Sequence, residues 1–392
     1  MNEFLPYAKH HIDESDCEAM KQALLSGVIT RGQTVTDFEN AIADYCGALY
    51  AVAFNSGSTA LKAACAAAEV SGADKFFTTP NSFVATAVCG VTSGVPPVFV
   101  DVDVETGNLD LDALAPNLVE RKTRGRKIII PVHYAGIPVD MQKLDSLVRD
   151  PETVIIEDAA AALGSFYDTY TRVGSCEWSD MTVFSFHPAK LITTGEGGMV
   201  TTNNPDLDRR LRAYRNNGIE REPERLSEYP GPWYYEVQSM SGNYNFTEFQ
   251  AALGLSQLNR MEAFIQHKKQ VITWYSRFLE AVPNIKLLKG LSEDLISPHL
   301  AVVLIDFDAI GISRGDFQNR LFDSNIGTQV HYIPIYRQPA FVKAFGNLSE
   351  YFPNMEQFYS QALSLPLSVD MTEAHVERVC HVLNDLITSK VS

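Results

Sequence analysis

The stretch Y-A-V-A-F-N-S-G-S-T-A-L, at residues 50–61, joins a short apolar run to a polar turn and then to an Ala/Leu-rich segment. Its first five residues predict a strand, and residues 59–70 predict a helix. Gly57 permits a tight turn between them. Backbone N–H groups and the helix dipole at such a helix start suit a phosphate group. Ordinary helix capping by Ser56 or Ser58 explains the same hydroxyls, so both interpretations stay open at this point.

Further apolar runs of strand length follow along the chain and alternate with helical stretches. They lie at residues 75–79, 97–101, 128–132, 154–158, 182–186 and 198–202. Continuous Val, Ile and Phe without polar alternation is typical of strands that are buried on both faces of a sheet. The pattern therefore predicts an α/β fold built on a mainly parallel, doubly wound sheet.

The pattern changes near residue 258. A long helical stretch at 259–282 is followed by expected strands at 301–307 and 328–331 and by a terminal helix at 372–388. We expect a large ligand-binding domain and a smaller α+β domain, with an N-terminal segment associated with the small one. The expected boundaries are 1–30 for the N-terminal segment, 31–257 for the large domain and 258–392 for the small domain.

Composition excludes several classes of function. The 392 residues carry 32 Lys and Arg against 48 Asp and Glu, a net charge of −16, which argues against a nucleic-acid or anionic-membrane partner. No apolar run approaches the ~18–20 residues that span a bilayer, and no signal peptide is evident. Six cysteines without C-x-x-C pairs predict free thiols in a reducing cytoplasm and no metal site.

Two more candidate groups stand at the carboxyl ends of expected strands, where open α/β sheets bind ligands. Asp158 can hold a cation or a protonated ring nitrogen, with helix capping as the alternative. Lys190 follows the strand at 182–186 in a loop rich in hydroxyls and glycines. A desolvated lysine there can attack a carbonyl, although a solvated loop lysine is the common case. A phosphate cradle, an acid and such a lysine are the three groups that pyridoxal phosphate (PLP) requires.

Several ordered motifs make the chain resemble the DegT/DnrJ/EryC1/StrS sugar aminotransferases, which are fold-type-I PLP enzymes. The motifs are N-S-G-S-T-A-L (55–61), P-N-S-F-V-A-T-A (80–87), V-H-Y-A-G-I-P-V-D-M (132–141), E-D-x-x-x-A-L-G (157–164), F-S-F-H-P-A-K-x-x-T-T-G-E-G-G (184–198), G-N-Y-x-x-T-E-F-Q-A-A-L-G (242–254) and V-H-Y-x-P-x-Y (330–336). The likeness runs nearly end to end. It implies a seven-stranded sheet in the large domain, and PLP bound covalently as an imine, with pyridoxamine phosphate as the amino-carrying form.

The resemblance also implies roles for individual residues. Lys190 matches the imine-forming lysine, and Asp158 matches the acid paired with the pyridine nitrogen, so these two are the expected catalytic residues. Phe83 matches the aromatic residue that stacks on the ring. Asn243 matches an asparagine contributed by a second subunit, which implies a homodimer with shared active sites. The remaining expected cofactor contacts are Gly57, Ser58, Thr59 and Ser185.

Within the family, the chain is most similar to the 4-aminotransferases of pseudaminic acid synthesis. The likeness rests on the sequence of residues 184–198 and on the segment G-P-W-Y-Y-E at 231–236. That subgroup acts on a UDP-linked 4-keto-6-deoxy-N-acetylhexosamine and takes its amino group from glutamate. The residues expected to line the nucleotide-sugar pocket, each with packing in the small domain as the alternative, are Tyr7, Thr30, His331, Tyr332 and Tyr336.

Two positions depart from the family pattern. Ala161 stands where the family usually has His or Gln, and Asn245 stands where it has Arg, a multi-donor cation. Two alternatives therefore stay open: amination at C-3 or of another nucleotide sugar, and a PLP-binding regulatory protein without transaminase activity. The family's dehydratase branch has His in place of Lys190, so the lysine in this chain disfavours that branch. A nicotinamide dehydrogenase is disfavoured because no G-x-G-x-x-G follows the first strand.

Overall fold

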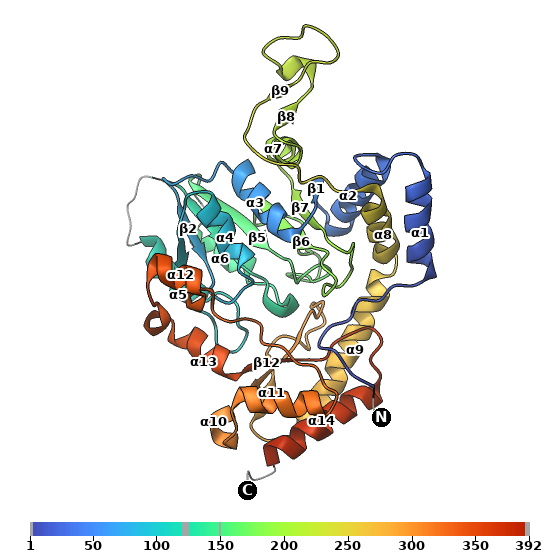
Figure 1. Ribbon diagram of the computed structural model, residues 1–392. Helices are drawn as coiled ribbons and strands as arrows, with labels where there is room; N and C mark the ends of the chain where they lie inside the picture. The colour runs from blue at the N-terminus through green and yellow to red at the C-terminus, as the bar shows by residue number, and fades with distance from the viewer. Residues whose placement is uncertain (1–2, 120–124, 149, 389–392) are drawn as a thin grey trace.

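A computed structural model describes residues 3–119, 125–148 and 150–388 (Figure 1). Its largest element is a seven-stranded sheet with the strand order β1-β7-β6-β5-β4-β2-β3. The strands are β1 (Tyr50–Phe54), β2 (Lys75–Thr78), β3 (Pro97–Phe99), β4 (Lys127–Ile130), β5 (Thr153–Asp158), β6 (Met181–Ser185) and β7 (Gly198–Thr202). Only β7 runs against its neighbours β6 and β1. The predicted α/β fold with a mainly parallel sheet is confirmed.

Helices cover both faces of this sheet. One face is covered by α3 (Gly57–Ala67), α4 (Ala85–Thr92) and α7 (Pro205–Arg215), and the other by α2 (Gln33–Cys46), α5 (Leu111–Val119) and α6 (Met141–Val148). In β4, Ile128 and Ile130 face the first group of helices and Ile129 faces the second, and all three are fully buried. Two-sided burial explains why these strands read as unbroken apolar runs.

The chain before α2 touches both parts of the molecule. Helix α1 (Glu14–Leu25) packs against α8 (Glu248–Leu258), and Arg260 forms ion pairs with Asp13 and Asp16 at the start of α1. Ahead of α1, Leu5 pairs with Ile326, and the Leu367 N–H donates to the Tyr7 carbonyl at 3.0 Å. The N-terminal segment thus runs from the C-terminal part of the chain to helix α8.

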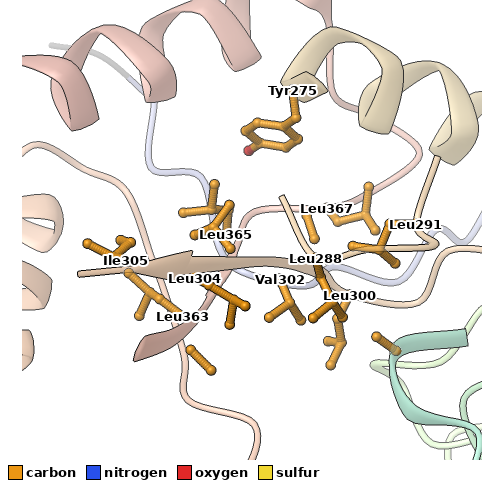
Figure 2. Close-up of a cluster of buried hydrophobic side chains, with 14 of the residues drawn as sticks. Tyr275, Leu288, Leu291, Leu300, Val302, Leu304, Ile305, Leu363, Leu365 and Leu367 are labelled. Atoms are coloured by element: carbon orange, nitrogen blue, oxygen red, sulfur yellow. The ribbon is translucent and has the colours of Figure 1, made fainter. Parts of the chain in front are cut away.

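The C-terminal part is built on a second, three-stranded antiparallel sheet with the order β10-β11-β12. In its core, the Tyr275 ring lies near Leu365 and Leu367, and its hydroxyl donates to the Pro366 carbonyl at 2.9 Å (Figure 2). The elements are α9 (Met261–Leu279), β10 (Ile285–Leu287), β11 (Ala301–Ile305), α10 (Phe307–Ile310), α11 (Arg314–Asp323), α12 (Pro339–Phe345), α13 (Pro353–Gln361), β12 (Ala362–Leu365) and α14 (Glu373–Thr388).

One strand prediction in this part is wrong. Residues 328–331 form no strand; Gln329 exchanges backbone hydrogen bonds with Ser364 alone, on the edge of β12 that faces away from β11. All four residues of β12 are buried, whereas Gln329 is exposed and Thr328 and Val330 are half-buried. The pairing with β12 does not continue, because the next residue opposite Gly327 would be Pro366, which has no N–H, and the Gly327 N–H donates to the Leu5 carbonyl at 2.7 Å instead.

A two-stranded arm, β8 (Ile219–Glu220) and β9 (Glu236–Val237), projects from the large domain beyond α7 (Figure 1). The loop between its strands carries exposed aromatic side chains, Tyr229 at 50% and Trp233 at 70% exposure. No helix in the described ranges is long and apolar enough to cross a membrane.

Candidate active site

The start of α3 forms a cradle of backbone N–H groups beside the end of β6. Ser56 caps the helix by accepting a hydrogen bond from the Thr59 N–H at 3.2 Å. A Cβ atom on Gly57 would lie only 2.9 Å from the Ser185 Cβ, so the helix start and Ser185 approach closely only because residue 57 is glycine. Ser58 is half-buried in the first turn. This geometry leaves free N–H groups, Ser58 and Ser185 together, which suits a phosphate.

Asp158 ends β5 and is 5% exposed. Its Oδ2 accepts a hydrogen bond from the Thr86 hydroxyl at 2.6 Å, and its Oδ1 accepts from the Ala160 N–H at 3.2 Å. The Ser82 hydroxyl lies 2.6 Å from that of Thr86. Helix α4 therefore orients the carboxylate from the side, at a site where Ala161 offers no polar group.

Phe83 lies one turn before Thr86, ahead of α4, and its ring is 59% exposed. The Phe83 carbonyl accepts a hydrogen bond from the Thr86 N–H at 3.2 Å. Thr86 therefore fixes the backbone of Phe83 and also bonds to the Asp158 carboxylate. An exposed aromatic ring beside a buried carboxylate offers a flat apolar surface to a planar ligand.

Lys190 follows a turn in which its N–H donates to the His187 carbonyl at 2.8 Å. Its side chain is half-buried, and Nζ lies 3.4 Å from the His299 Nε2 atom. Burial lowers the pKa of the Lys190 amine to about 8, although the charge of Asp158 opposes this shift. The lysine therefore supplies more unprotonated amine near neutral pH than an ordinary lysine does.

A buried polar network lies behind Asp158. Burial pushes the pKa of Glu157 upward, but bonds from His133, Ser179 and Tyr167 outweigh burial and lower this pKa below its ordinary value. The His133 Nε2 atom is 2.7 Å from Glu157, and His133 Nδ1 accepts from the Val139 N–H at 3.0 Å. Nε2 must therefore carry the proton, and the network fixes the end of β5 from the face opposite Asp158.

Three of the predicted substrate residues meet beside this site. The Tyr7 and His331 ring centroids are 5.4 Å apart, and those of His331 and Tyr332 are 4.9 Å apart. Burial and the charge of Lys190 lower the pKa of His331 to about 4. Burial raises the pKa of Tyr332, and the nearby charge of Asp158 adds to the rise. Tyr7, His331 and Tyr332 thus border the Lys190 and Asp158 pair.

Three other predicted site residues lie elsewhere in this chain. Tyr336 is 1% exposed; its hydroxyl donates to Glu356 at 2.8 Å and its ring stacks on Phe352 at 5.0 Å. Thr30 is exposed and bridges to Thr247 before α8, and Asn243 is exposed and bridges to Asn216. Among the contacts of the described residues, none joins these three side chains to Lys190.

Sequence reasoning missed two groups that the structure places at this site, Thr86 and His299. Thr86 lies within the motif at 80–87, three residues after Phe83 and in the first turn of the helix that follows it, which is a usable signal. His299 stands in an apolar stretch ahead of β11, where the local sequence gives no hint of its contact with Lys190.

The arrangement fits PLP, because the α3 cradle beside Ser185, the oriented Asp158 carboxylate and the Lys190 amine match its phosphate, ring nitrogen and aldehyde. The parts of the chain that the structure covers contain no group of three or more His, Cys, Asp or Glu side chains able to hold a metal ion. Fold and site together define a PLP-dependent enzyme of fold type I.

The chain belongs to the DegT/DnrJ/EryC1/StrS aminotransferase family, whose model matches residues 10–384. It is 31% identical over 368 residues to the UDP-4-amino-4,6-dideoxy-N-acetyl-beta-L-altrosamine transaminase of Campylobacter jejuni, covering 94% of this chain and 93% of that protein. The protein is therefore an aminotransferase.

Two solved structures are similar over nearly the whole chain. One is Helicobacter pylori PseC, an aminotransferase involved in the biosynthesis of pseudoaminic acid, with a TM-score of 0.88, 30% identity and 98% and 99% coverage of the two chains. The other is the PMP-form of the sugar aminotransferase Spr1654 of Streptococcus pneumoniae, with a TM-score of 0.87, 25% identity and coverage of 98% and 99%. The cofactor of this enzyme is PLP.

Proposed function

We propose that the enzyme transfers an amino group from glutamate to the C-4 keto group of a UDP-linked 4-keto-6-deoxy-N-acetylhexosamine. The observation that carries this proposal is the placement of Tyr7, His331 and Tyr332 beside Lys190 and Asp158. The likeness to a transaminase of a UDP-linked 4,6-dideoxy sugar supports the choice of acceptor.

PLP supplies an electron sink when bound and carries the amino group between the two substrates. In our proposal Lys190 takes a proton from one carbon and returns it to another, as a general base and then a general acid. Its pKa of about 8 suits both roles near neutral pH. Asp158 stabilises a positive charge on the ring nitrogen, and Thr86 keeps its carboxylate in place. Phe83 covers the ring, and the α3 start with Gly57, Ser58, Thr59 and Ser185 holds the phosphate.

We further propose a homodimer in the cytoplasm, with two active sites at the subunit interface. Asn243 is exposed, and no contact among the described residues joins it to the Lys190 group, which agrees with a role in the site of a second subunit. The large domain at 31–257 would carry the cofactor, and the small domain at 258–392, joined by the segment 1–30, would close over the acceptor.

Asn245 is the reason why a different sugar substrate remains the alternative. Its Nδ2 donates to the Asn243 Oδ1 at 2.7 Å, while its own Oδ1 is buried without a partner in the described chain. This oxygen can accept a hydrogen bond, whereas the arginine of the family pattern can only donate one. The difference favours C-3 amination, or amination of another nucleotide sugar, as the alternative. The complete set of Lys190, Asp158 and the α3 cradle argues against a non-catalytic regulatory protein.

The test begins with the visible absorbance of the PLP-loaded protein before and after glutamate. We expect a yellow band that bleaches with glutamate and returns when the UDP-linked 4-keto sugar is added. The product, analysed by mass spectrometry and NMR, should carry its new amino group at C-4. Lys190→Ala should show no bleaching and no turnover. An amino group at C-3, or turnover of another nucleotide sugar alone, would replace the proposed acceptor by the second one.

A further inference from the structure

A second lysine lies buried beside Lys190. Lys268, on α9, is 5% exposed, and no carboxylate of the described residues forms an ion pair with it. Burial, aided by the charge of Lys190, lowers the pKa of Lys268 to about 8. Burying a cation without an ion-pair partner costs free energy, so a buried unpaired lysine indicates a position that binds an anionic ligand.

His299 completes a basic pair with Lys268 around the Lys190 amine. Its side chain is 6% exposed, its Nε2 is 3.4 Å from the Lys190 Nζ, and its Nδ1 is buried without a partner in the described chain. Burial and the charges of Lys190 and Lys268 hold the pKa of His299 well below its ordinary value. The ring is therefore neutral at physiological pH, so one of its nitrogens can donate a hydrogen bond.

A small cavity lined by Lys190 and Lys268, and not by His299, contains basic side chains and no carboxylate, in a chain whose net charge is −16. Two of its basic groups already have a carboxylate partner, because Lys9 and His11 each lie 2.9 Å from an Asp370 oxygen. Among the described residues, Lys268 has no such partner. The polar residues around the cavity include Lys9, His10, His11, Lys190, Gln257 and Lys268.

We propose that Lys268 and His299 form the subsite that binds the carboxylate of the amino donor. The proposal rests on the proposed function in taking the donor to be an amino acid. The nitrogen of such a donor must take the place of the Lys190 Nζ, and its carboxylate carbon is only two bonds away from that nitrogen. The carboxylate therefore comes within reach of the groups that surround Nζ, where His299 offers a donor and Lys268 a charge. The acceptor sugar has no such anion next to its reacting carbon.

The first experiment measures binding without reaction. Glutarate, a dicarboxylate that lacks the amino group, is titrated into the PLP-loaded enzyme by calorimetry. Because charge-assisted hydrogen bonds are the strong ones, Lys268→Met should weaken glutarate binding about 10-fold or more, and Lys268→Arg should restore most of it. Lys269→Met is the matched control, since the adjacent Lys269 amine bonds to the Asp294 carbonyl instead. His299→Asn gives a second variant if Lys268→Met loses its cofactor band.

The second experiment follows the bleaching of the cofactor band by glutamate. In Lys268→Met the glutamate concentration for half-maximal rate should rise about 10-fold with a smaller change in the maximal rate, because the lost contact is one that both the bound substrate and the transition state make. UDP binding should not change.

The outcomes separate this inference from the proposed function. Glutarate binding that depends on Lys268 supports the subsite whichever sugar is the acceptor, and even if another amino acid replaces glutamate. Unchanged glutarate binding in both Lys268→Met and His299→Asn would overturn it, as would wild-type enzyme that binds no glutarate. A loss of UDP binding in place of glutarate binding would assign the cation to the nucleotide and would equally overturn the proposal.

Discussion

At the scale of single residues, the Lys190 amine sets the pH at which cofactor attaches. Only the unprotonated amine attacks the PLP aldehyde, and its pKa is lowered from 10.5 to about 8. We expect the attachment rate in apoenzyme to rise with pH and to reach half its maximum near pH 8. Because the charge of Asp158 raises the pKa of Lys190, Asp158→Asn should move this midpoint lower. Stopped-flow absorbance measures both; a midpoint near that of a free lysine would contradict the burial argument.

Thr86 is a positioning residue whose hydroxyl holds the Asp158 Oδ2. Thr86→Val keeps the shape and removes the donor, which leaves a buried carboxylate oxygen unpaired at a cost of about 1–3 kcal/mol. We expect turnover to fall about 10-fold, since that energy range includes 1.4 kcal/mol per factor of ten. The absorbance maximum of bound PLP should shift as well, which a purely structural role would not cause. Thr86→Ser is the control that restores the hydroxyl; activity that stays low in it would point to packing instead.

These residues show where sequence information ends. Lys190 and Asp158 stand in ordered motifs at strand ends, so the sequence predicts both their place and their chemistry. Lys268 lies three residues from both Ile265 and Val271 on α9, so helical spacing already places it on the buried face of the helix and separates it from the neighbouring Lys269. The helix pattern does not show that this face approaches Lys190, because that contact joins segments far apart in the chain.

At the scale of elements, the junction of β6 and α3 depends on one glycine. Gly57→Ala adds a methyl group that meets the Ser185 Cβ at 2.9 Å, so the helix start must move away from Ser185. We expect PLP affinity to fall about 10-fold or more, because several N–H bonds to the phosphate lose their geometry together. Titration of apoenzyme with PLP gives the affinity.

The matched control is Gly315→Ala at the start of α11, where the nearest atom lies 3.9 Å from the added carbon. Alanine favours a helix over glycine by up to about 1 kcal/mol, so this variant should be as stable as wild type or more so, with unchanged PLP affinity. Equal PLP affinity in Gly57→Ala and wild type would show that the phosphate lies elsewhere.

Elements with a strong local pattern could be predicted, and those that depend on pairing with a distant segment could not. The strands around Ile128–Ile130 and Val154–Asp158 appear within two residues of their expected positions, because burial on both faces leaves an unbroken apolar run. The strand expected at 328–331 fails, since only Gln329 pairs with β12 and the Gly327 N–H bonds to Leu5 instead. Whether an edge segment pairs over its whole length depends on the partner strand, which no local pattern contains.

At the scale of the whole molecule, the single chain leaves a group of aromatic side chains exposed to solvent. The loop between β8 and β9 carries Trp233 and Tyr235, which are 70% and 47% exposed and belong to none of the buried hydrophobic clusters. Asn243 lies at the base of the same region, where its bridge to Asn216 follows α7. Exposed aromatic side chains of this kind are typical of a surface that a partner covers, and the proposed homodimer supplies one.

A mixed-subunit experiment tests whether the active sites are shared. Lys190→Ala and Asn243→Glu should each abolish activity as pure homodimers, the second because it places a negative charge at the proposed phosphate site. If Asn243 serves the Lys190 of the other subunit, a mixed dimer holds one site with both changes and one site with neither. Random reassociation of equal amounts should then restore roughly a quarter of wild-type activity, since half of the dimers are mixed and each has one intact site. If Asn243 acts within its own chain, every site in the mixed dimer carries one change, and the mixture stays inactive. Sedimentation velocity on the same samples shows whether dimers formed and exchanged, so an inactive mixture of exchanged dimers would refute the shared site, whereas restored activity requires that the two chains complete each other's cofactor site.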